Sequence, residues 1–267
     1  MRLKVASWNV ASVRAHMDCV ERFVTQHKPH VLCLQETKVR DDQFPLAPFR
    51  KWGYTRHALH GQAGYHGVAV FARRNVKLEE PANLKWAAKE DARHIHCRIL
   101  DGIELHNFYV PAGGDIPDPV VNDKFQHKLD FLRECTDWFA STRDDGRRAI
   151  LLGDLNIAPL ETDVWSHKQL LKVVSHTPVE VEAMAKWQAS HDWVDTVREF
   201  VPADEKIYSW WSYRAKDWEA ADKGRRLDHI WVTPALRPAL KKAYIVREAR
   251  GWAPASDHVP VIAEFDV

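Results

Sequence analysis

The stretch AILLGDLN at residues 149–156 is a run of four apolar residues that leads into a glycine and a carboxylate. The stretch VLCLQE at residues 31–36 has a similar design and ends in Glu36. A short apolar run bounded by turn residues predicts a strand that is buried on both faces. A carboxylate at the end of a buried strand is costly unless it is paired or binds a metal. These two stretches therefore predict a buried sheet with an acidic site at its edge.

The C-terminal part of the chain repeats this arrangement. Asp228 lies within the apolar stretch at residues 227–233. Asp257 and His258 come directly before the alternating apolar residues of 259–266. Carboxylates and an imidazole carried on rigid strands are typical of a metal-assisted hydrolase.

The remaining periodicity predicts an α/β protein. Strands are predicted at residues 3–9, 31–34, 67–73, 103–110, 149–152, 227–233 and 259–266, and helices at 14–28, 125–139 and 180–200. Because some strands follow one another directly, we expect two mixed β-sheets packed face to face, with helices on the outer faces, as a four-layer α/β sandwich. No Ser/Gly linker and no short repeat interrupts the pattern, so we expect a single catalytic domain over residues 1–267.

Composition excludes some classes of protein. A net charge of +1 excludes a globally basic, histone-like binder, although a local basic face is enough to bind nucleic acid. The longest apolar run, residues 68–72, is too short to span a membrane, and no signal peptide is visible at the N-terminus. The cysteines form no Cys-x-x-Cys pair, which favours reduced thiols in a cytoplasmic protein and leaves a disulfide as the alternative. They are Cys19, Cys33, Cys97 and Cys135.

Six short motifs occur in a fixed order along the chain. They are SWNV at 7–10, LQETK at 34–38, NFYVP at 107–111, GDLN at 153–156, RLDH at 226–229 and SDHVP at 256–260. Together they resemble the exonuclease III group of apurinic/apyrimidinic endonucleases, within the endonuclease/exonuclease/phosphatase superfamily. The resemblance runs from residue 3 to residue 265. It implies a metal-dependent DNA repair nuclease that hydrolyses the phosphodiester 5′ to abasic sites, with 3′–5′ exonuclease and 3′-phosphatase activity.

The chemistry of phosphodiester hydrolysis suits the same residues. The reaction needs an aimed and deprotonated water and a group that stabilises charge on the phosphate. Glu36 is the candidate ligand for Mg²⁺, which prefers oxygen ligands, and Mn²⁺ is the alternative ion. By resemblance, Asp154 looks like the base that deprotonates the water, and Asn156 looks like the residue that positions the water or the phosphate. Taken alone, the pair reads equally well as a turn after a strand.

Further catalytic residues are assigned through the resemblance. Asp228 and His258 look like a carboxylate–imidazole pair, in which the carboxylate favours the protonated ring. Asp257 is expected near the metal. Tyr109 and Asn9 are expected to donate hydrogen bonds to the phosphate, although a Tyr in an alternating strand is usually a core residue.

Residues 208–218 interleave aromatic and basic side chains, which suits stacking on sugars or bases beside phosphates. The alternative is a strand and loop that bury their tryptophans. The resemblance implies that Trp210 and Leu227 line an apolar pocket for a base-less deoxyribose. It also implies contacts to the phosphates of double-stranded DNA, at abasic sites or 3′ ends, from Lys38, Arg93, Lys124 and Arg214.

Three positions depart from the family pattern. Ala11 stands where relatives often carry an Asp or Asn, so a metal ligand is missing there. Ala112 replaces an amide side chain, and Arg225 replaces an aromatic or aliphatic residue. These departures bear on metal affinity and on the balance of activities, and they leave the core reaction intact.

Two alternatives remain open from the sequence. One is another phosphoesterase of the same superfamily, acting on lipid or inositol phosphates or on RNA. The other is a non-catalytic nucleic-acid binder, against which the complete set of polar residues at strand ends argues. Separately, His94 and His96 share a strand face that could suit zinc, but without a visible third ligand a structural role is favoured. We expect a monomer.

Overall fold

The computed structural model describes residues 1–100 and 102–267, which form two six-stranded sheets. The first sheet contains, in spatial order, β13 (Leu240–Ile245), β14 (Val261–Asp266), β1 (Arg2–Asn9), β2 (Val31–Gln35), β4 (Val68–Arg73) and β3 (Tyr54–His60). The second contains β5 (Leu78–Ala82), β6 (His94–Ile99), β7 (Ile103–Tyr109), β8 (Ala149–Asp154), β12 (Asp228–Val232) and β9 (Val194–Asp195). In each sheet one parallel pair, β1–β2 or β7–β8, is flanked by antiparallel strands.

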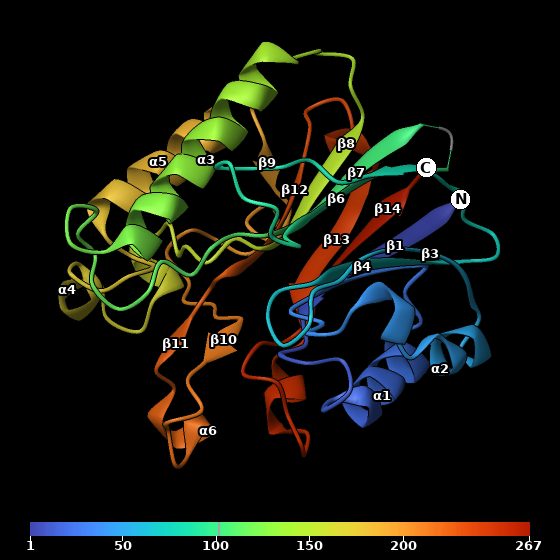
Figure 1. Ribbon diagram of the computed structural model, residues 1–267, viewed down its shortest axis with the longest axis horizontal. Coiled ribbons are helices and arrows are strands. Elements are labelled where there is room, and N and C mark those ends of the chain that lie inside the picture. Colours follow the sequence, from blue (N-terminus) through green and yellow to red (C-terminus); the bar gives the residue numbers. More distant parts are fainter. Residues whose placement is uncertain (101) are drawn as a thin grey trace.

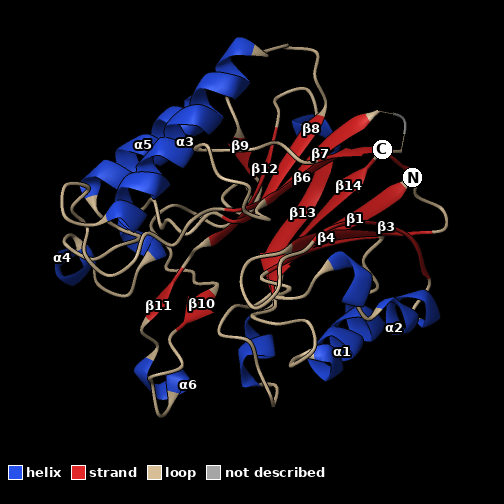
Figure 2. Ribbon diagram, viewed as in Figure 1, coloured by secondary structure: helices blue, strands red, loops and turns tan. Residues whose placement is uncertain are grey.

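Helices cover the outer face of each sheet (Figures 1 and 2). The first sheet is covered by α1 (Met17–His27) and α2 (Leu46–Lys51), and the second by α3 (Asp123–Ser141) and α5 (Pro178–Ala189). The smaller elements are α4 (His167–Leu170), α6 (Trp218–Ala221), the ribbon β10 (Trp210–Trp211) with β11 (Gly224–Arg225), and the 3₁₀ turns η1 (Asp41–Gln43), η2 (Glu161–Asp163), η3 (Arg237–Ala239) and η4 (Arg247–Gly251). The predicted four-layer α/β sandwich is confirmed.

The core lies between the two sheets, where apolar side chains of both inner faces meet. Val5 and Val31 of the first sheet are fully buried in the same cluster as Leu105 and Ile150 of the second. Full burial of one such side chain contributes about 1.5–3 kcal/mol. Because the outer faces are also covered, the central strands are apolar on both sides, which explains the continuous apolar runs.

Strand register brings the predicted strand ends to one edge. Asn9 pairs with Gln35 in the parallel β1–β2 pair, and Tyr109 pairs with Asp154 in the parallel β7–β8 pair. Asp228 begins the antiparallel strand β12 directly opposite Asp154. The polar residues therefore end neighbouring strands on the same side of the sandwich.

The structure differs from the periodicity in two respects. The helix predicted at 180–200 is wrong beyond Ala189, because the chain turns at Asp192, which has a left-handed φ of 51°, and then enters β9. The list of predicted strands lacks the four edge strands of the two sheets, β3, β5, β9 and β13, as well as the inner strand β6 and the short ribbon of β10 and β11. An edge strand has a neighbouring strand on one side only and is less covered by the rest of the protein, so its sequence carries a weaker apolar pattern.

All four cysteines are buried free thiols, as predicted. Among the helices of the described part of the chain, none has the length and apolarity required to cross a membrane.

Candidate active site

Asn9 stands at the centre of the convergent strand ends. Its Nδ2 atom donates to Glu36 Oε1 at 3.0 Å and to Asp154 Oδ2 at 2.8 Å. The same atom lies 3.4 Å from His258 Nε2. One amide of the first sheet therefore holds together a carboxylate from its own sheet and a carboxylate from the other.

Asp154 is placed by the close approach of β8 to β7. Gly153 has a φ of 139°, and a Cβ at this position would lie 1.9 Å from the Phe108 carbonyl oxygen, so only glycine fits. Asn156 holds the carboxylate from the other side, with Nδ2 donating to Asp154 Oδ2 at 3.1 Å. Burial raises the pKa of Asp154 to about 7; His258 opposes this rise and Asp228 adds to it.

We expect the Asp154 carboxyl of the metal-free protein to titrate near pH 7, compared with about 3.9 for an ordinary Asp. The raised pKa means that Asp154 is protonated in acid and becomes a base only as the pH rises through this value. Carboxyl ¹³C NMR measures the titration, and Asp154→Asn assigns the signal. A bound cation lowers the midpoint by its positive charge. A metal-free midpoint below about pH 5 would contradict the assigned burial effect.

The predicted pair of Asp228 and His258 is present. His258 Nδ1 lies 2.8 Å from Asp228 Oδ2, which also accepts a hydrogen bond from Ser209 Oγ at 2.6 Å. Burial alone would lower the pKa of His258, but Asp228 and Asp154 outweigh burial and raise it well above the ordinary range. The ring is therefore an imidazolium whose Nε2–H faces the cluster, 3.7 Å from Asp154 Oδ2.

Glu36 carries the oxygen donors that suit a hard cation. Burial would raise its pKa, but the hydrogen bond from Asn9 and the charge of Lys38 lower it, so the carboxylate is ionised. Tyr109 also donates to Glu36 Oε1, at 2.8 Å, while Lys38 Nζ lies 3.0 Å from Oε2. Mg²⁺ binds one or two carboxylates and keeps several waters. This donor set fits such an ion, with Asp257 lining the same cleft.

Three side chains of this same site are close enough to hold a metal themselves. Asp154, Asp228 and His258 place one ligand atom each within 4.8 Å of one another. His258 is held protonated by its neighbours, and an imidazolium has no free lone pair on either nitrogen for a metal. The ion is therefore better assigned to Glu36. Ala11 adds no ligand, and its backbone N–H donates to Asn9 Oδ1 at 3.0 Å.

The cluster opens into a cleft of about 630 Å³. Trp210 and Leu227 line the cleft together with Arg214. Trp210 Nε1 donates to Asp257 Oδ2 at 2.9 Å, and the Arg225 guanidinium lies 5.2 Å from the Trp210 ring centroid. Arg225 therefore fixes the aromatic wall of the cleft by a cation–π contact.

The other predicted phosphate contacts are less exposed or lie outside the cleft lining. Lys38 is paired with Glu36. Arg93 is largely buried, with Nε 3.2 Å from Asp91 Oδ2 and Nη1 donating to the Tyr109 carbonyl. Lys124 lies in the first turn of α3. The structure therefore brings Arg214 to the cleft and places Arg93 and Lys124 beyond its lining residues.

Sequence reasoning missed the polar residues that support the site from behind. Gln35 is fully buried and donates to Ser7 Oγ at 3.1 Å and to Asn107 Oδ1 at 2.7 Å, which links the two sheets below Glu36. A polar residue inside the apolar alternation of 103–110 was the available signal for Asn107. No signal in the sequence distinguishes Ser209, which donates a hydrogen bond to Asp228.

These features define a metal-assisted phosphoesterase of the α/β sandwich type. A buried carboxylate with a raised pKa can accept a proton from water, an imidazolium can donate to a phosphate oxygen, and an ionised Glu can bind a hard cation. The profile of the Endonuclease/Exonuclease/phosphatase family matches residues 6–258. The chain belongs to this family.

Individual relatives match over nearly the whole chain. An exodeoxyribonuclease III of Haemophilus influenzae is 28% identical over 98% of this chain and 100% of its own. The structure is similar to that of an AP endonuclease from Archaeoglobus fulgidus, with a TM-score of 0.91 and 33% identity over 99% of this chain and 100% of the other. A 3′ phosphatase from Neisseria bound to a product DNA hairpin matches with a TM-score of 0.85 and 29% identity over 99% and 100%. The resemblance drawn from the six motifs is confirmed.

Proposed function

We propose that this protein is a Mg²⁺-dependent DNA repair nuclease that hydrolyses the phosphodiester 5′ to an abasic site and leaves a 3′-hydroxyl. We also propose removal of 3′-terminal nucleotides and 3′ phosphates. Relatives named exodeoxyribonuclease III, AP endonuclease and 3′ phosphatase support a DNA repair nuclease that cleaves phosphodiesters. The observation that carries the proposal is the contact of the buried Asn9 with both Glu36 and Asp154, two carboxylates that line a cleft together with aromatic and basic side chains.

In the proposed mechanism each residue transfers a proton, stabilises a charge or orients another group. Asp154 accepts the proton of the attacking water, and Asn156 keeps the carboxylate oriented. His258 donates its Nε2–H to a non-bridging phosphate oxygen, where negative charge develops. Tyr109 donates to Glu36, and Asn9 donates to both Glu36 and Asp154, so these two residues orient the carboxylates in place of the phosphate contacts that the resemblance implied. Glu36, with Asp257 nearby, would hold a Mg²⁺ ion, whose positive charge would lower the pKa of a bound water and offset the charge of the phosphate; Mn²⁺ is the alternative ion.

The cleft favours a duplex with a missing base. Trp210 and the buried Leu227 offer an apolar wall next to the catalytic groups, which suits a deoxyribose that carries no base. Arg214 and Lys223 add positive charge to the same cleft, next to the path expected for the DNA backbone. We propose that residues 1–267 act as one catalytic domain and a monomer, inside the cell where the DNA lies.

The test is a duplex with a single abasic analogue, incubated with protein and Mg²⁺. We expect one nick on the 5′ side of the lesion that disappears with chelator and returns with added Mg²⁺. Glu36→Gln removes the carboxylate charge, so the Mg²⁺ concentration needed for half-maximal rate is expected to rise about tenfold or more.

Two further substrates test whether the protein has the activity of other members of the superfamily instead. An intact duplex of the same sequence and a soluble phosphoinositide are incubated in parallel with the protein and Mg²⁺. Turnover of the phosphoinositide without nicking of the abasic duplex would reject the DNA repair assignment. Nicking that persists in chelator would reject the metal dependence.

A further inference from the structure

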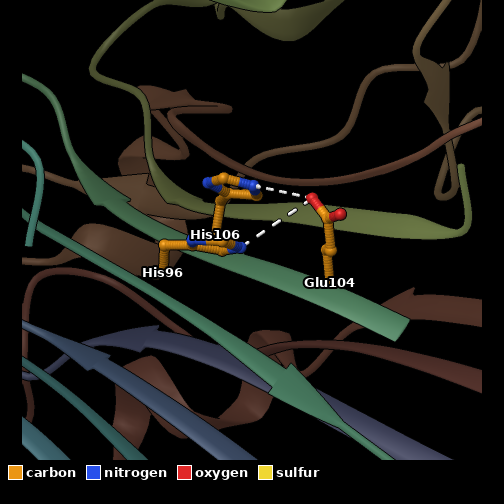
Figure 3. Close-up of side chains that lie close together, drawn as sticks. All are labelled: His96, Glu104 and His106. Carbon is orange, nitrogen blue, oxygen red and sulfur yellow. Dashed lines mark ion pairs between the residues drawn. The ribbon is translucent and has the colours of Figure 1, made fainter. Parts of the chain in front are cut away.

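A second cluster of titratable side chains lies on the helix-covered face of the second sheet. Figure 3 shows His96 of β6 with Glu104 and His106 of β7, whose polar atoms point toward one another. The antiparallel register pairs His96 directly with His106, and Glu104 is two residues before His106 on the same face. Glu104 and Tyr109 lie at opposite ends of β7, roughly 16 Å apart along a strand that rises about 3.3 Å per residue. The cluster is therefore separate from the catalytic cleft.

The separations suit three ligands of one ion better than a hydrogen-bond network. Glu104 Oε2 lies 3.8 Å from His96 Nε2 and 3.8 Å from His106 Nε2, as the dashed lines in Figure 3 mark. Each of these distances is too long for a hydrogen bond. The three ligand atoms lie within 4.8 Å of one another. Zinc bonds to nitrogen and oxygen are about 2.0–2.2 Å long. The rings of His96 and His106 are stacked, with centroids 4.4 Å apart and planes 8° apart, so both rings tilt when their lone pairs meet at one ion.

Both imidazoles present a nitrogen to this space that nothing in the described part of the chain satisfies. The Nε2 atoms of His96 and His106 are buried without a hydrogen-bond partner, and His106 is 0% exposed. A buried polar atom that lacks a partner costs about 1–3 kcal/mol. Burial lowers the pKa of His106 to about 4 and also lowers that of His96, so both rings are neutral and each has one lone pair.

His94 sets the orientation of the buried ligand. Its Nε2 atom lies 3.1 Å from His106 Nδ1. When His106 donates its Nδ1–H to this nitrogen, the lone pair of His106 is on Nε2 and faces Glu104. A metal-binding His almost always donates its other ring N–H in this way. His94 is fully buried and therefore neutral, which lets it act as the acceptor.

We propose that His96, Glu104 and His106 form a second metal site, which binds a zinc-class transition-metal cation with water as the remaining ligand. Two imidazoles with one carboxylate favour such an ion over Mg²⁺, which prefers oxygen. The side chains of His96 and Glu104 are 23% and 18% exposed, which gives the ion and its water a path from solvent.

Arg147 is expected to lower the affinity of this site for a metal ion. Its Nε atom lies 3.6 Å from Glu104 Oε2. This charge keeps Glu104 ionised but repels a cation at the same carboxylate. We therefore expect Arg147→Ala to tighten metal binding, an effect opposite to that of removing a ligand.

The experiment titrates Zn²⁺ alone into the purified Glu36→Gln protein, so that the proposed catalytic ligand does not contribute. Calorimetry is expected to find one site that His96→Ala weakens at least tenfold, whereas His57→Ala, on the exposed surface, leaves it intact. Co²⁺ in place of Zn²⁺ should give a visible absorption band that His96→Ala removes. With free Zn²⁺ at about 100 times the Kd, the parent Tm should rise about 5 °C.

Glu104→Gln provides a second variant, which keeps the size of the side chain and removes its charge. Circular dichroism checks that each variant is folded. Weakening in both folded variants supports the proposal. The proposal is overturned if either folded variant keeps the zinc affinity, the cobalt absorption and the Tm shift of the Glu36→Gln protein. It is also overturned if the Glu36→Gln protein binds no zinc.

Discussion

Asp154→Asn is expected to lower kcat on an abasic duplex by about 10²–10⁴-fold, the usual contribution of a general base. An amide has the shape of the carboxylate but cannot accept the proton of water. Substrate binding should change little, because only 1% of Asp154 is exposed and the amide keeps the size of the carboxylate. Single-turnover kinetics at saturating protein separate the chemical step from binding.

The same variant should remain folded. Burial raises the pKa of Asp154 and so disfavours its ionised form, a penalty that a neutral amide removes. The amide has only one acceptor oxygen where both carboxylate oxygens accept hydrogen bonds, so we expect a small fall in Tm in a folded protein. Asp137→Asn, on the exposed face of α3, is the matched control and should keep full activity. Turnover of Asp154→Asn within about threefold of the parent would remove Asp154 from the mechanism.

The interior of the fold was predictable because burial on two faces leaves a clear signal. The runs at 31–34 and 149–152 are apolar throughout, since one side of each strand faces the other sheet and the second faces helices. At the sheet edges this constraint weakens. The strand β5 is mostly exposed, for example, and its sequence carries no alternation.

The convergence of the candidate carboxylates was predictable because they end buried strands, where an unpaired carboxylate needs an explanation, whereas their individual roles come from the resemblance and remain proposals. Side-chain clusters that form only through the register of neighbouring strands could not be predicted from the sequence. Glu104 and His106 complete the second cluster with His96 only through the register of β6 on β7, which sequence spacing does not reveal. Basic residues were the least predictable, since the sequence does not distinguish the buried, paired Arg93 from the exposed Arg214.

His258→Asn should also lower kcat by at least about 10²-fold. The variant loses the imidazolium that faces the phosphate, and it leaves Asp228 in a buried site with Ser209 as its remaining side-chain partner. Circular dichroism and Tm check the fold, and kcat is compared with that of His57→Ala, an exposed histidine. Parent-like kcat in folded His258→Asn would show that this ring does not act on the phosphate.

Asp228→Asn separates the two members of the pair. Asp228 raises the pKa of His258, so its loss lowers that pKa. Because the ring must be protonated to donate, the loss of kcat at alkaline pH should move to lower pH in Asp228→Asn. The double variant should be about as slow as His258→Asn alone, since Asp228 acts through the ring. Independent, multiplicative losses in the double variant, with an unshifted pH profile in Asp228→Asn, would show that the carboxylate has a role of its own.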